Sequence, residues 1–324
     1  MKPRIYIARD LPEPVASYLE EHCECRYWQG PGDISEEQLA EKIGDAEGLL
    51  VTATPIGQAV LRAGSSLRVI SNLSAGYNNL DLRALQQRKL IATHTPYVLD
   101  ETVADLAMAL LLAAARRVTA MDRLVKRGGW VKGMDAELYG LDVHHKRLGI
   151  IGMGRIGEAI ARRAALGFEM DVVYYNRSPK PEAEERFGLR YCSMDTLLDT
   201  SDFVLLMTPL TPETKHLMGK AQFARMKSNA IFVNVSRGEN VDEEALIYAL
   251  QQGQIAGAGL DVYEHEPISV EHPLLQMDNV VTLPHIGSAT AETRLNMAFA
   301  AARNLVHALT GQTPVQIVPE LQQQ

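Results

Sequence analysis

The sequence contains few cysteines and only one short Cys/His cluster. Its three cysteines are Cys23, Cys25 and Cys192, in a chain of 324 residues. A small and odd number of cysteines suits a reducing compartment better than a disulfide framework. The run His22-Cys23-Glu24-Cys25 has no second Cys/His pair to complete the four ligands that zinc requires, so we expect no metal site.

The sequence also lacks an excess of positive charge and a long apolar run. A formal net charge of -8 gives no sign of the clustered Lys and Arg that bind nucleic acid or an anionic membrane surface. We expect neither as a partner. The longest apolar run, Leu106 to Ala115, is far shorter than the roughly 20 residues of a membrane-spanning helix. Charges at positions 2, 4 and 9 leave the N-terminal segment unlike a secretory signal. We therefore expect a cytoplasmic protein.

What the sequence does contain is a regular alternation of short apolar runs with helical segments, over a length that suits two domains. The apolar runs are continuous, which is typical of strands covered on both faces of a parallel sheet. Their alternation with helices predicts βαβ units and an α/β fold in both halves. The expected strands are residues 4–8, 48–52, 68–72 and 90–94, then 148–152, 171–176, 202–207, 230–235, 258–262 and 280–284. Shorter helices are expected at 12–22, 35–44 and 81–88.

Two longer helical patterns flank the second set of strands. The first covers residues 101–126 and stops before Gly128, and we expect one spine helix between the domains. The second covers residues 289–309 and is ended by Gly311. Periodicity leaves open whether this last helix returns to the first domain.

The segment LGIIGMGRIGEAIARR has the order strand, Gly-rich turn, helix. Gly152 permits a tight turn, Gly154 lets a pyrophosphate approach the backbone, and Gly157 lets the helix pack against the strand. The helix N-terminus then faces the anion. A lone Gly-x-Gly-x-x-Gly is weak evidence, but this one lies inside a βαβ unit. We therefore expect the run from Gly152 to Gly157, with Arg155 and Ile156, to bind a dinucleotide.

A carboxylate is missing from the end of the next strand. At this point, about 20 residues beyond the turn, NAD-binding proteins place an Asp or Glu on the ribose 2′-OH. Here the residues are Asn176, Arg177 and Ser178. Asn176 cannot repel a 2′-phosphate, Arg177 can pair with it, and Ser178 can donate to it. This predicts a preference for NADP(H); if Arg177 is only a solvated loop cation, NAD(H) is accepted as well.

Three polar residues follow later strands: Arg237, Glu266 and His285. Ligands of open α/β sheets bind at the carboxyl ends of strands, where all three are expected. The Arg can hold a substrate carboxylate and polarise an adjacent carbonyl, and the His can deliver or accept the alcohol proton. A neighbouring carboxylate fixes the His tautomer and favours its protonated form. With a nicotinamide nearby, these groups suit hydride transfer at C2 of a 2-keto acid; Glu264 competes with Glu266 for the carboxylate role.

Four ordered motifs, GMGRIG, NVSRGENVDEEAL, GLDVYEHEP and PHIGSAT, resemble those of the D-isomer-specific 2-hydroxyacid dehydrogenases. The likeness extends through LSAGYNNLD and ETVADLAMALLLAAARR and so covers nearly the whole chain. Within that family the chain most resembles the bacterial glyoxylate/hydroxypyruvate reductases that also reduce 2-ketogluconate. The segment GGWVKG and the run YGLDVHHKRLGIIGMGRIG carry most of this similarity.

The resemblance implies a role for each reactive residue. Arg237 would bind the substrate carboxylate and orient the carbonyl, Glu266 would support the His, and His285 would protonate the forming alkoxide. The backbone N–H groups of Ala75 and Gly76, in LSAGY, would hold the substrate carboxylate together with Arg237. The implied reaction is the NADPH-dependent reduction of glyoxylate, hydroxypyruvate or 2-ketogluconate.

Further positions match residues that line the dinucleotide in the family. They are Thr102, Thr208, Pro209, Val235 and Asp261. Asp261 has a second interpretation, as a structural carboxylate at the end of a strand.

The resemblance also implies two Rossmann-like lobes and a homodimer. The substrate-binding lobe would be discontinuous, residues 1–98 plus 286–324, and the dinucleotide-binding lobe would be residues 99–285. The dimer would form through the long spine helix. Trp130 matches a position that reaches the neighbouring subunit's site in related reductases; alternatively, it only packs in the dimer contact.

Three other functions share the fold. A nucleotide-sensing corepressor would bind dinucleotide and partner proteins, but the complete Arg, Glu and His set favours an enzyme. Formate dehydrogenases of the superfamily carry Gln where Glu266 stands. A D-3-phosphoglycerate dehydrogenase would need extra cations for its phosphate-bearing substrate, and LSAGYNNL offers none.

Overall fold

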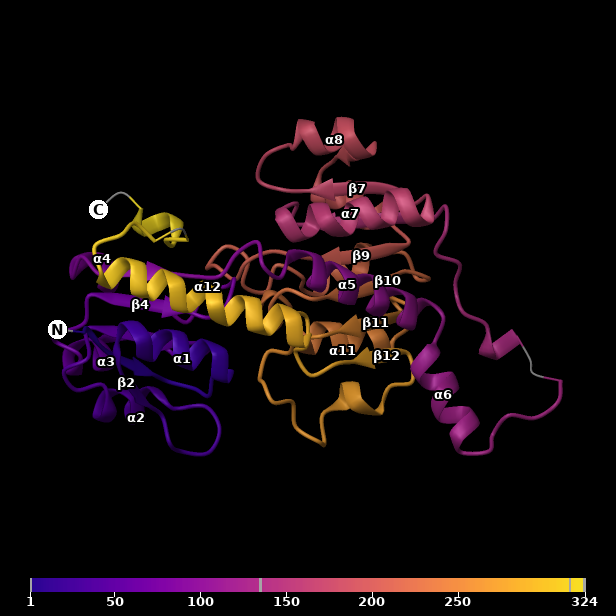
Figure 1. Ribbon diagram of the computed structural model, residues 1–324. Coiled ribbons are helices and arrows are strands. Elements are labelled where there is room, and N and C mark those ends of the chain that lie inside the picture. The colour runs from indigo at the N-terminus through magenta and orange to yellow at the C-terminus, as the bar shows by residue number, and fades with distance from the viewer. Residues whose placement is uncertain (1, 134–135, 315, 323–324) are drawn as a thin grey trace. The chain divides into compact units, whose positions relative to one another are not determined.

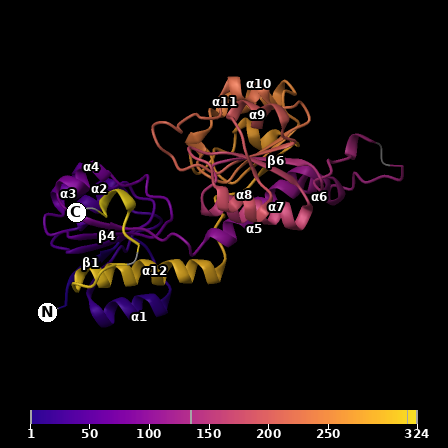
Figure 2. The same cartoon turned by 90° about the horizontal axis from the view of Figure 1, so that it is seen from above.

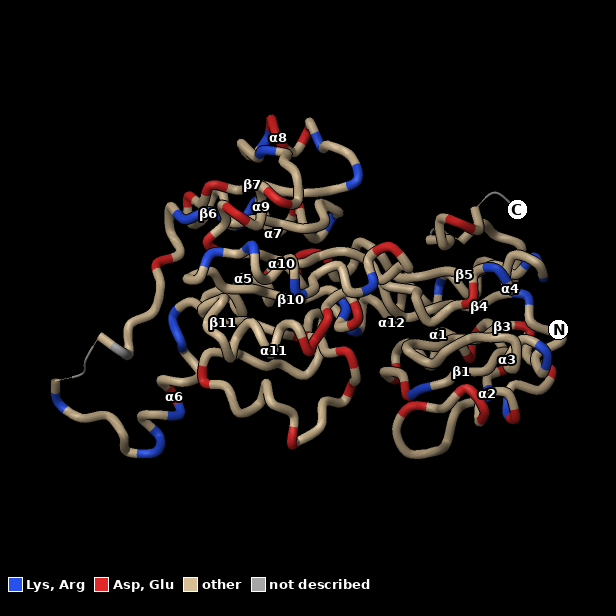
Figure 3. Tube along the Cα trace, turned by 180° about the vertical axis from the view of Figure 1, so that it is seen from behind, with Lys and Arg blue, Asp and Glu red and all other residues tan. Residues whose placement is uncertain are grey.

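The computed structural model describes residues 2–133, 136–314 and 316–322 (Figure 1). The chain forms two units, one of Met1–Leu99 with Ser288–Gln324 and the other of Asp100–Gly287. Each unit is built on one sheet whose strands pair in parallel. This confirms the α/β fold with two parallel sheets. Lys and Arg are interspersed with Asp and Glu along both units (Figure 3).

The first unit has a five-stranded sheet in the order β2-β1-β3-β4-β5. Its strands are β1 (Arg4–Ile7), β2 (Glu24–Tyr27), β3 (Gly48–Val51), β4 (Val69–Asn72) and β5 (Ile91–Thr93). Helices α1 (Glu13–His22) and α12 (Ala291–Leu309) cover one face, and α2 (Glu36–Lys42), α3 (Gln58–Ala63) and α4 (Leu82–Gln87) the other (Figure 2). The sequence did not predict β2, because this edge strand alternates between exposed and half-buried residues and has no continuous apolar run.

Helix α12 packs on the sheet of the first unit, although it follows the second unit in sequence. Its small residues Ala298, Ala301 and Ala302 are buried, which lets the helix approach the strands closely. The buried Ser71 hydroxyl of β4 donates to the carbonyl of Ala301 at 2.8 Å. The helix begins at the N-cap Thr290, whose side chain accepts from the Thr293 N–H.

The second unit has a seven-stranded sheet in the order β12-β11-β10-β9-β6-β7-β8. Its strands are β6 (Arg147–Ile151), β7 (Asp171–Tyr175), β8 (Arg190–Tyr191), β9 (Phe203–Leu206), β10 (Ile231–Asn234), β11 (Gly257–Leu260) and β12 (Val280–Thr282). Helices α5 (Asp100–Ala115), α7 (Arg155–Phe168) and α8 (Pro181–Phe187) cover one face, and α9 (Met194–Thr200), α10 (Lys220–Arg225) and α11 (Glu243–Gln251) the other (Figure 2). Strand order reverses between β6 and β9, and a ligand site is expected at such a switch point.

The prediction of one spine helix over residues 101–126 was wrong. The segment forms α5, which ends at Ala115, and α6 (Val118–Lys126). Between them Arg117 adopts a left-handed conformation with φ 55°, which interrupts the regular helical hydrogen bonding. Helix α5 lies buried against the sheet, whereas α6 and the segment after it leave the helical layers (Figure 1).

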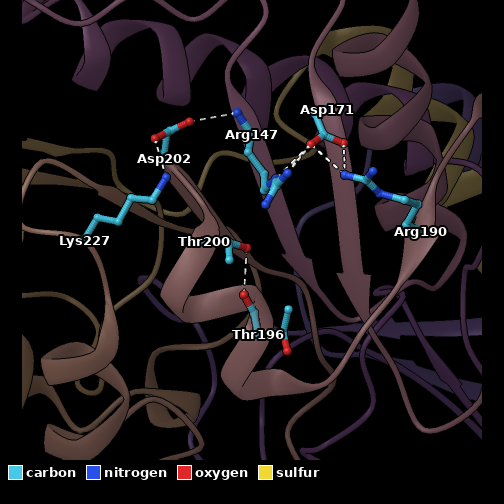
Figure 4. A network of polar contacts seen from close by, with 7 residues as sticks. All are labelled: Arg147, Asp171, Arg190, Thr196, Thr200, Asp202 and Lys227. Carbon is cyan, nitrogen blue, oxygen red and sulfur yellow. Dashed lines mark hydrogen bonds and ion pairs between the residues drawn. The ribbon is translucent and has the colours of Figure 1, made fainter.

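Ion pairs hold the amino ends of the strands in the second unit (Figure 4). The Arg147 guanidinium donates to Asp171 at 2.8 Å and the Arg190 guanidinium contacts the same carboxylate at 2.6 Å. Asp202 accepts from the Arg147 N–H and from Lys227, both at 2.9 Å. These pairs lie at one edge of the sheet, and the predicted site residues follow the strands at the other edge.

Candidate active site

The Gly-rich turn after β6 has the geometry of a pyrophosphate cradle. Gly152 adopts φ 103°, a conformation that only glycine adopts without strain. A Cβ at Gly157 would overlap the carbonyl oxygen of Gly152, whereas a Cβ at Gly154 would meet nothing within 4 Å. The missing side chain at Gly157 lets α7 pack close to β6. The open space at Gly154 leaves the backbone accessible at the N-terminus of α7. The residues therefore fit a dinucleotide pyrophosphate.

The loop after β9 lies directly against this turn. A Cβ at Gly152 would overlap the Met207 carbonyl and lie 3.0 Å from the Thr208 methyl group. The fully buried Asn240 fixes Thr208 by donating to its carbonyl at 2.9 Å and to its hydroxyl at 3.1 Å. Arg155, in the first turn of α7, forms an ion pair of 2.9 Å with Asp100 at the start of α5.

The other residues predicted to line the dinucleotide also belong to the second unit. Val235 is buried directly after β10, and Pro209 is exposed after β9. Ile156, in the first turn of α7, is half-buried and packs against the core of the unit. Thr102 lies in the first turn of α5 and is half-buried.

The segment after β7 presents the Asn-Arg-Ser sequence at the same edge of the sheet. Asn176 is half-buried, and its side-chain amide donates to the carbonyl of Ser178 at 3.1 Å. Arg177 and Ser178 are exposed. Their side chains are therefore accessible to a phosphate group of a bound dinucleotide.

His285 and Glu266 form a close pair at the carboxyl ends of β12 and β11. The Nδ1 atom of His285 lies 2.6 Å from Oε2 of Glu266. The other oxygen, Oε1, accepts from the Tyr263 N–H at 3.0 Å, so that the carboxylate is fixed from both sides. Because Nδ1 faces the carboxylate, Nε2 is the ring nitrogen that can face a substrate. Glu264, the alternative carboxylate, pairs with His216 at 3.2 Å instead.

The Glu266 carboxyl is held in its charged form. Burial acts to raise its pKa, but the hydrogen bonds from His285 and the Tyr263 N–H, together with the charge of Arg237, outweigh burial and lower the pKa. A negative charge therefore stands beside the His285 ring throughout the neutral pH range.

Asp261 positions the His285 loop through the backbone. It is 1% exposed, and its two oxygens accept from the N–H groups of Ile286 and Gly287, both at 2.8 Å. Burial raises the pKa of Asp261, and these N–H groups and His285 oppose that shift. The observed hydrogen bonds match the structural interpretation of this residue.

Arg237 follows β10, in a loop fixed by side chains within it. The amide of Asn234 donates to the Arg237 carbonyl at 3.0 Å, and its oxygen accepts from the Ser236 N–H at 3.0 Å. A Cβ at Gly238 would overlap the backbone carbonyl of Tyr263. The absence of a side chain at Gly238 thus lets the Arg237 loop pack on the loop that carries Glu266.

Ala75 and Gly76 lie in the first unit, in the loop after β4. The Gly76 carbonyl accepts from the side chain of Asn72 at 2.8 Å, and the Ala75 carbonyl lies 2.9 Å from Nδ1 of His94. These contacts direct both carbonyls to side chains of the same unit.

Trp130 lies in the segment after α6, and 66% of it is exposed. Other apolar residues on α6 and in the segment after it are exposed as well: Val118, Val125, Val131 and Tyr139. We name this set of exposed apolar residues, on α6 and in the segment that follows it, the α6 surface.

Several residues that organise the site were not identified from the sequence. They act through the backbone or through short contacts: Asn72, His94, Asn234, Gly238, Asn240 and Tyr263. Asn234, Gly238 and Asn240 lie within the quoted motif NVSRGENVDEEAL. Asn234 bonds to residues beside it in the same loop, whereas Gly238 and Asn240 contact Tyr263 and Thr208, which are distant in sequence. No local sequence pattern predicts contacts between residues that are distant in sequence.

No group of three or more His, Cys, Asp or Glu side chains that could hold a metal ion occurs within residues 2–133, 136–314 and 316–322. His22 ends α1, and Cys23 leads into β2. In the same described parts of the chain, every helix is too short or too polar to cross a membrane.

Comparisons with known proteins agree on one family. A family model described as D-isomer specific 2-hydroxyacid dehydrogenase, NAD binding domain, matches residues 108–287. Glyoxylate/hydroxypyruvate reductase B of Klebsiella pneumoniae is 51% identical over 311 residues, and that of Escherichia coli is 52% identical, each match covering 96% of both chains. The crystal structure of an NADPH-dependent glyoxylate/hydroxypyruvate reductase from Sinorhizobium meliloti, in complex with NADP and malonate, is 31% identical with a TM-score of 0.88, and the match covers 99% of this chain and 98% of that one.

Proposed function

The chain belongs to the D-isomer-specific 2-hydroxyacid dehydrogenase family, and from this premise we propose that it reduces glyoxylate and hydroxypyruvate with NADPH. It is an NAD(P)-dependent oxidoreductase. Reduction of small 2-keto acids agrees with the names of its relatives, and 2-ketogluconate belongs to the same substrate class. The cytoplasm is the proposed location.

The observation that carries the proposal is the His285–Glu266 pair of 2.6 Å, in the same unit as the Gly-rich turn. A dinucleotide held at the Gly-rich turn would supply the hydride for C2 of the keto acid. As the C–O π electrons move onto oxygen, the His285 ring gives a proton from Nε2 to that oxygen and later recovers one from solvent. Glu266 stabilises the protonated ring before the transfer and fixes its orientation.

Arg237 is proposed to bind the substrate carboxylate and to polarise the carbonyl. A guanidinium offers two parallel N–H donors to a carboxylate and keeps its charge at any physiological pH. Burial lowers the pKa of Arg237, and the carboxylates of Glu266 and Glu239 oppose that shift. The N–H groups of Ala75 and Gly76 are proposed to bind the same substrate carboxylate.

The cofactor preference is proposed to come from Asn176, Arg177 and Ser178. The accessible Arg177 and Ser178 can pair with and donate to a ribose 2′-phosphate, and Asn176 presents no negative charge to it. NADPH is therefore the proposed cofactor, with NADH as the weaker alternative.

A homodimer is proposed to cover the α6 surface. Large apolar side chains that are exposed together are typical of a protein–protein contact. Trp130, which belongs to this set, either packs in that contact or reaches the site of the second copy.

The function is tested by kcat/KM for glyoxylate, hydroxypyruvate, 2-ketogluconate and 3-phosphohydroxypyruvate, each with NADPH and with NADH. We expect turnover of the first two and higher values with NADPH. Near-equal values with both cofactors would contradict the cofactor proposal alone. No turnover of any keto acid would favour a binding protein, and turnover confined to 3-phosphohydroxypyruvate would favour a phosphoglycerate dehydrogenase.

A further inference from the structure

The segment Asn176–Lys180, between β7 and α8, is held at both ends by tyrosine hydroxyls. At its far end, the Lys180 N–H donates to the Tyr174 hydroxyl at 2.5 Å. At its near end, the Tyr191 hydroxyl donates to the Asn176 carbonyl at 3.2 Å. Arg177 and Ser178 lie between these two anchors.

The Tyr174 hydroxyl uses both of its hydrogen-bonding capacities. It accepts from Lys180 and donates to Oε1 of Glu184, in α8, at 2.6 Å. Tyr174 is 0% exposed, and burial together with the Glu184 hydrogen bond raises its pKa to about 12. The hydroxyl therefore remains a donor over the whole working range of pH and connects the segment to α8.

The two anchors also support each other. Tyr174 of β7 pairs with Tyr191 of β8 in the sheet, and the two rings meet edge to face with their centroids 5.5 Å apart. Each ring thus fixes the direction of the other hydroxyl. The two strands that carry the anchors are adjacent, so the segment is held from one rigid element.

We propose that Tyr174 and Tyr191 are positioning residues for cofactor specificity: their hydroxyls hold Asn176–Lys180 in the conformation in which Arg177 and Ser178 contact a 2′-phosphate. This rests on the proposed NADPH preference. A bidentate Arg–phosphate contact requires a fixed backbone, because an unrestrained loop loses conformational entropy on binding. NAD(H) has no 2′-phosphate and gains nothing from that restraint, so the anchors favour NADP(H) selectively.

The test is the Kd of NADP⁺ and of NAD⁺, measured by isothermal titration calorimetry on the full-length wild type, Tyr174→Phe and Tyr191→Phe. Each variant removes one hydroxyl and keeps its ring. We expect the Kd of NADP⁺ to rise roughly two- to tenfold, the factor that corresponds to one hydrogen bond, and the Kd of NAD⁺ to stay constant. Titration with 2′,5′-ADP should show the same loss as NADP⁺.

The matched control is Tyr27→Phe. It removes a Tyr–Glu hydrogen bond of similar length, 2.8 Å to Glu20, in the first unit, and should leave both Kd values unchanged. If Tyr174→Phe does not fold, Tyr191→Phe decides alone, since that side chain is 41% exposed and tolerates the loss of its hydroxyl.

A double variant shows whether Tyr174 acts through Arg177. In an Arg177→Ala background, Tyr174→Phe should raise the Kd of NADP⁺ by a smaller factor than in the wild type. Equal factors in both backgrounds, an unchanged NADP⁺ affinity, or equal losses for NADP⁺ and NAD⁺ would overturn the inference. Equal affinities of the wild type for the two dinucleotides would instead overturn the proposed cofactor preference on which it rests.

Discussion

The Nδ1 atom of His285 lies 2.6 Å from Oε2 of Glu266, although the two residues belong to different loops. The loops follow adjacent parallel strands, β11 and β12, whose carboxyl ends meet at one edge of the sheet. Asp261 holds the His285 loop through two backbone N–H groups, and the Tyr263 N–H holds Glu266. The pair is thus fixed before any substrate arrives.

Replacing the carboxylate should change the pH dependence of catalysis. In Glu266→Gln no negative charge stands beside the His285 ring to stabilise its protonated form. We expect the pH profile of kcat/KM for hydroxypyruvate reduction to move to lower pH. The control is Glu264→Gln, in the same loop but paired with His216, and its profile should not move. An unmoved profile in Glu266→Gln would indicate a structural role for Glu266.

The same carboxylate should affect stability in acid. Because the pKa of Glu266 is lowered from 4.5 in the folded protein, the unfolded chain binds more protons just below pH 4.5. The contribution of Glu266 to the free energy of unfolding is therefore present above that pH, and it is lost as the pH falls through the lowered pKa. We expect the free energy of unfolding, from urea titrations between neutral and acid pH, to fall more steeply in wild type than in Glu266→Gln. Parallel curves would contradict this.

Arg237 should affect both substrate binding and the chemical step. Arg237→Ala removes the fork that binds the carboxylate and the charge that polarises the carbonyl. We expect KM for the keto acid to rise and kcat to fall, with roughly a 10- to 100-fold loss in kcat/KM, as for hydrogen bonds to charged groups. Arg237→Lys keeps the charge and should recover only part of the loss. Steady-state kinetics of Arg237→Ala equal to those of wild type would show that Arg237 does not bind the substrate.

The contact of Gly238 with Tyr263 should be needed for activity. In Gly238→Ala the new Cβ would overlap the Tyr263 carbonyl and separate the Arg237 loop from the Glu266 loop. We expect a loss of about 1–3 kcal/mol in stability, as for overpacked sites, together with a lower kcat. Gly167→Ala is the matched control, because a Cβ there would meet nothing within 4 Å and α7 would gain helix propensity. Equal melting temperatures for both variants would contradict the contact.

The sequence predicts the buried parts of the fold well and the exposed edges poorly. Every expected strand is present to within two residues at either end, because continuous apolar runs report burial on both faces. The edge strands β2 and β8 have no such run and were not predicted. The break between α5 and α6 was not predicted either, since Arg117 takes its left-handed conformation without a Gly or Pro to signal it.

The residues of the site likewise divide into those that a local motif predicts and those that only the fold brings together. The Gly-rich turn is local, so its residues and their roles follow from spacing. The partner of His285 is not local, because Glu264 and Glu266 are equivalent in the sequence and only the fold of the Tyr263–Glu266 loop distinguishes them. The anchoring tyrosines of β7 and β8 depend on strand pairing, which no local pattern announces.

The most direct test is the initial rate of NADPH oxidation with hydroxypyruvate, measured for wild type and His285→Ala. His216→Ala is the control, because it removes the His of another His–Glu pair in the same unit. We predict turnover by wild type and by His216→Ala. In His285→Ala we predict a kcat lower by about 10²–10⁴-fold, the usual contribution of a general acid, with an unchanged Kd for NADPH. Wild-type turnover in His285→Ala would contradict the assignment of His285 as the proton donor.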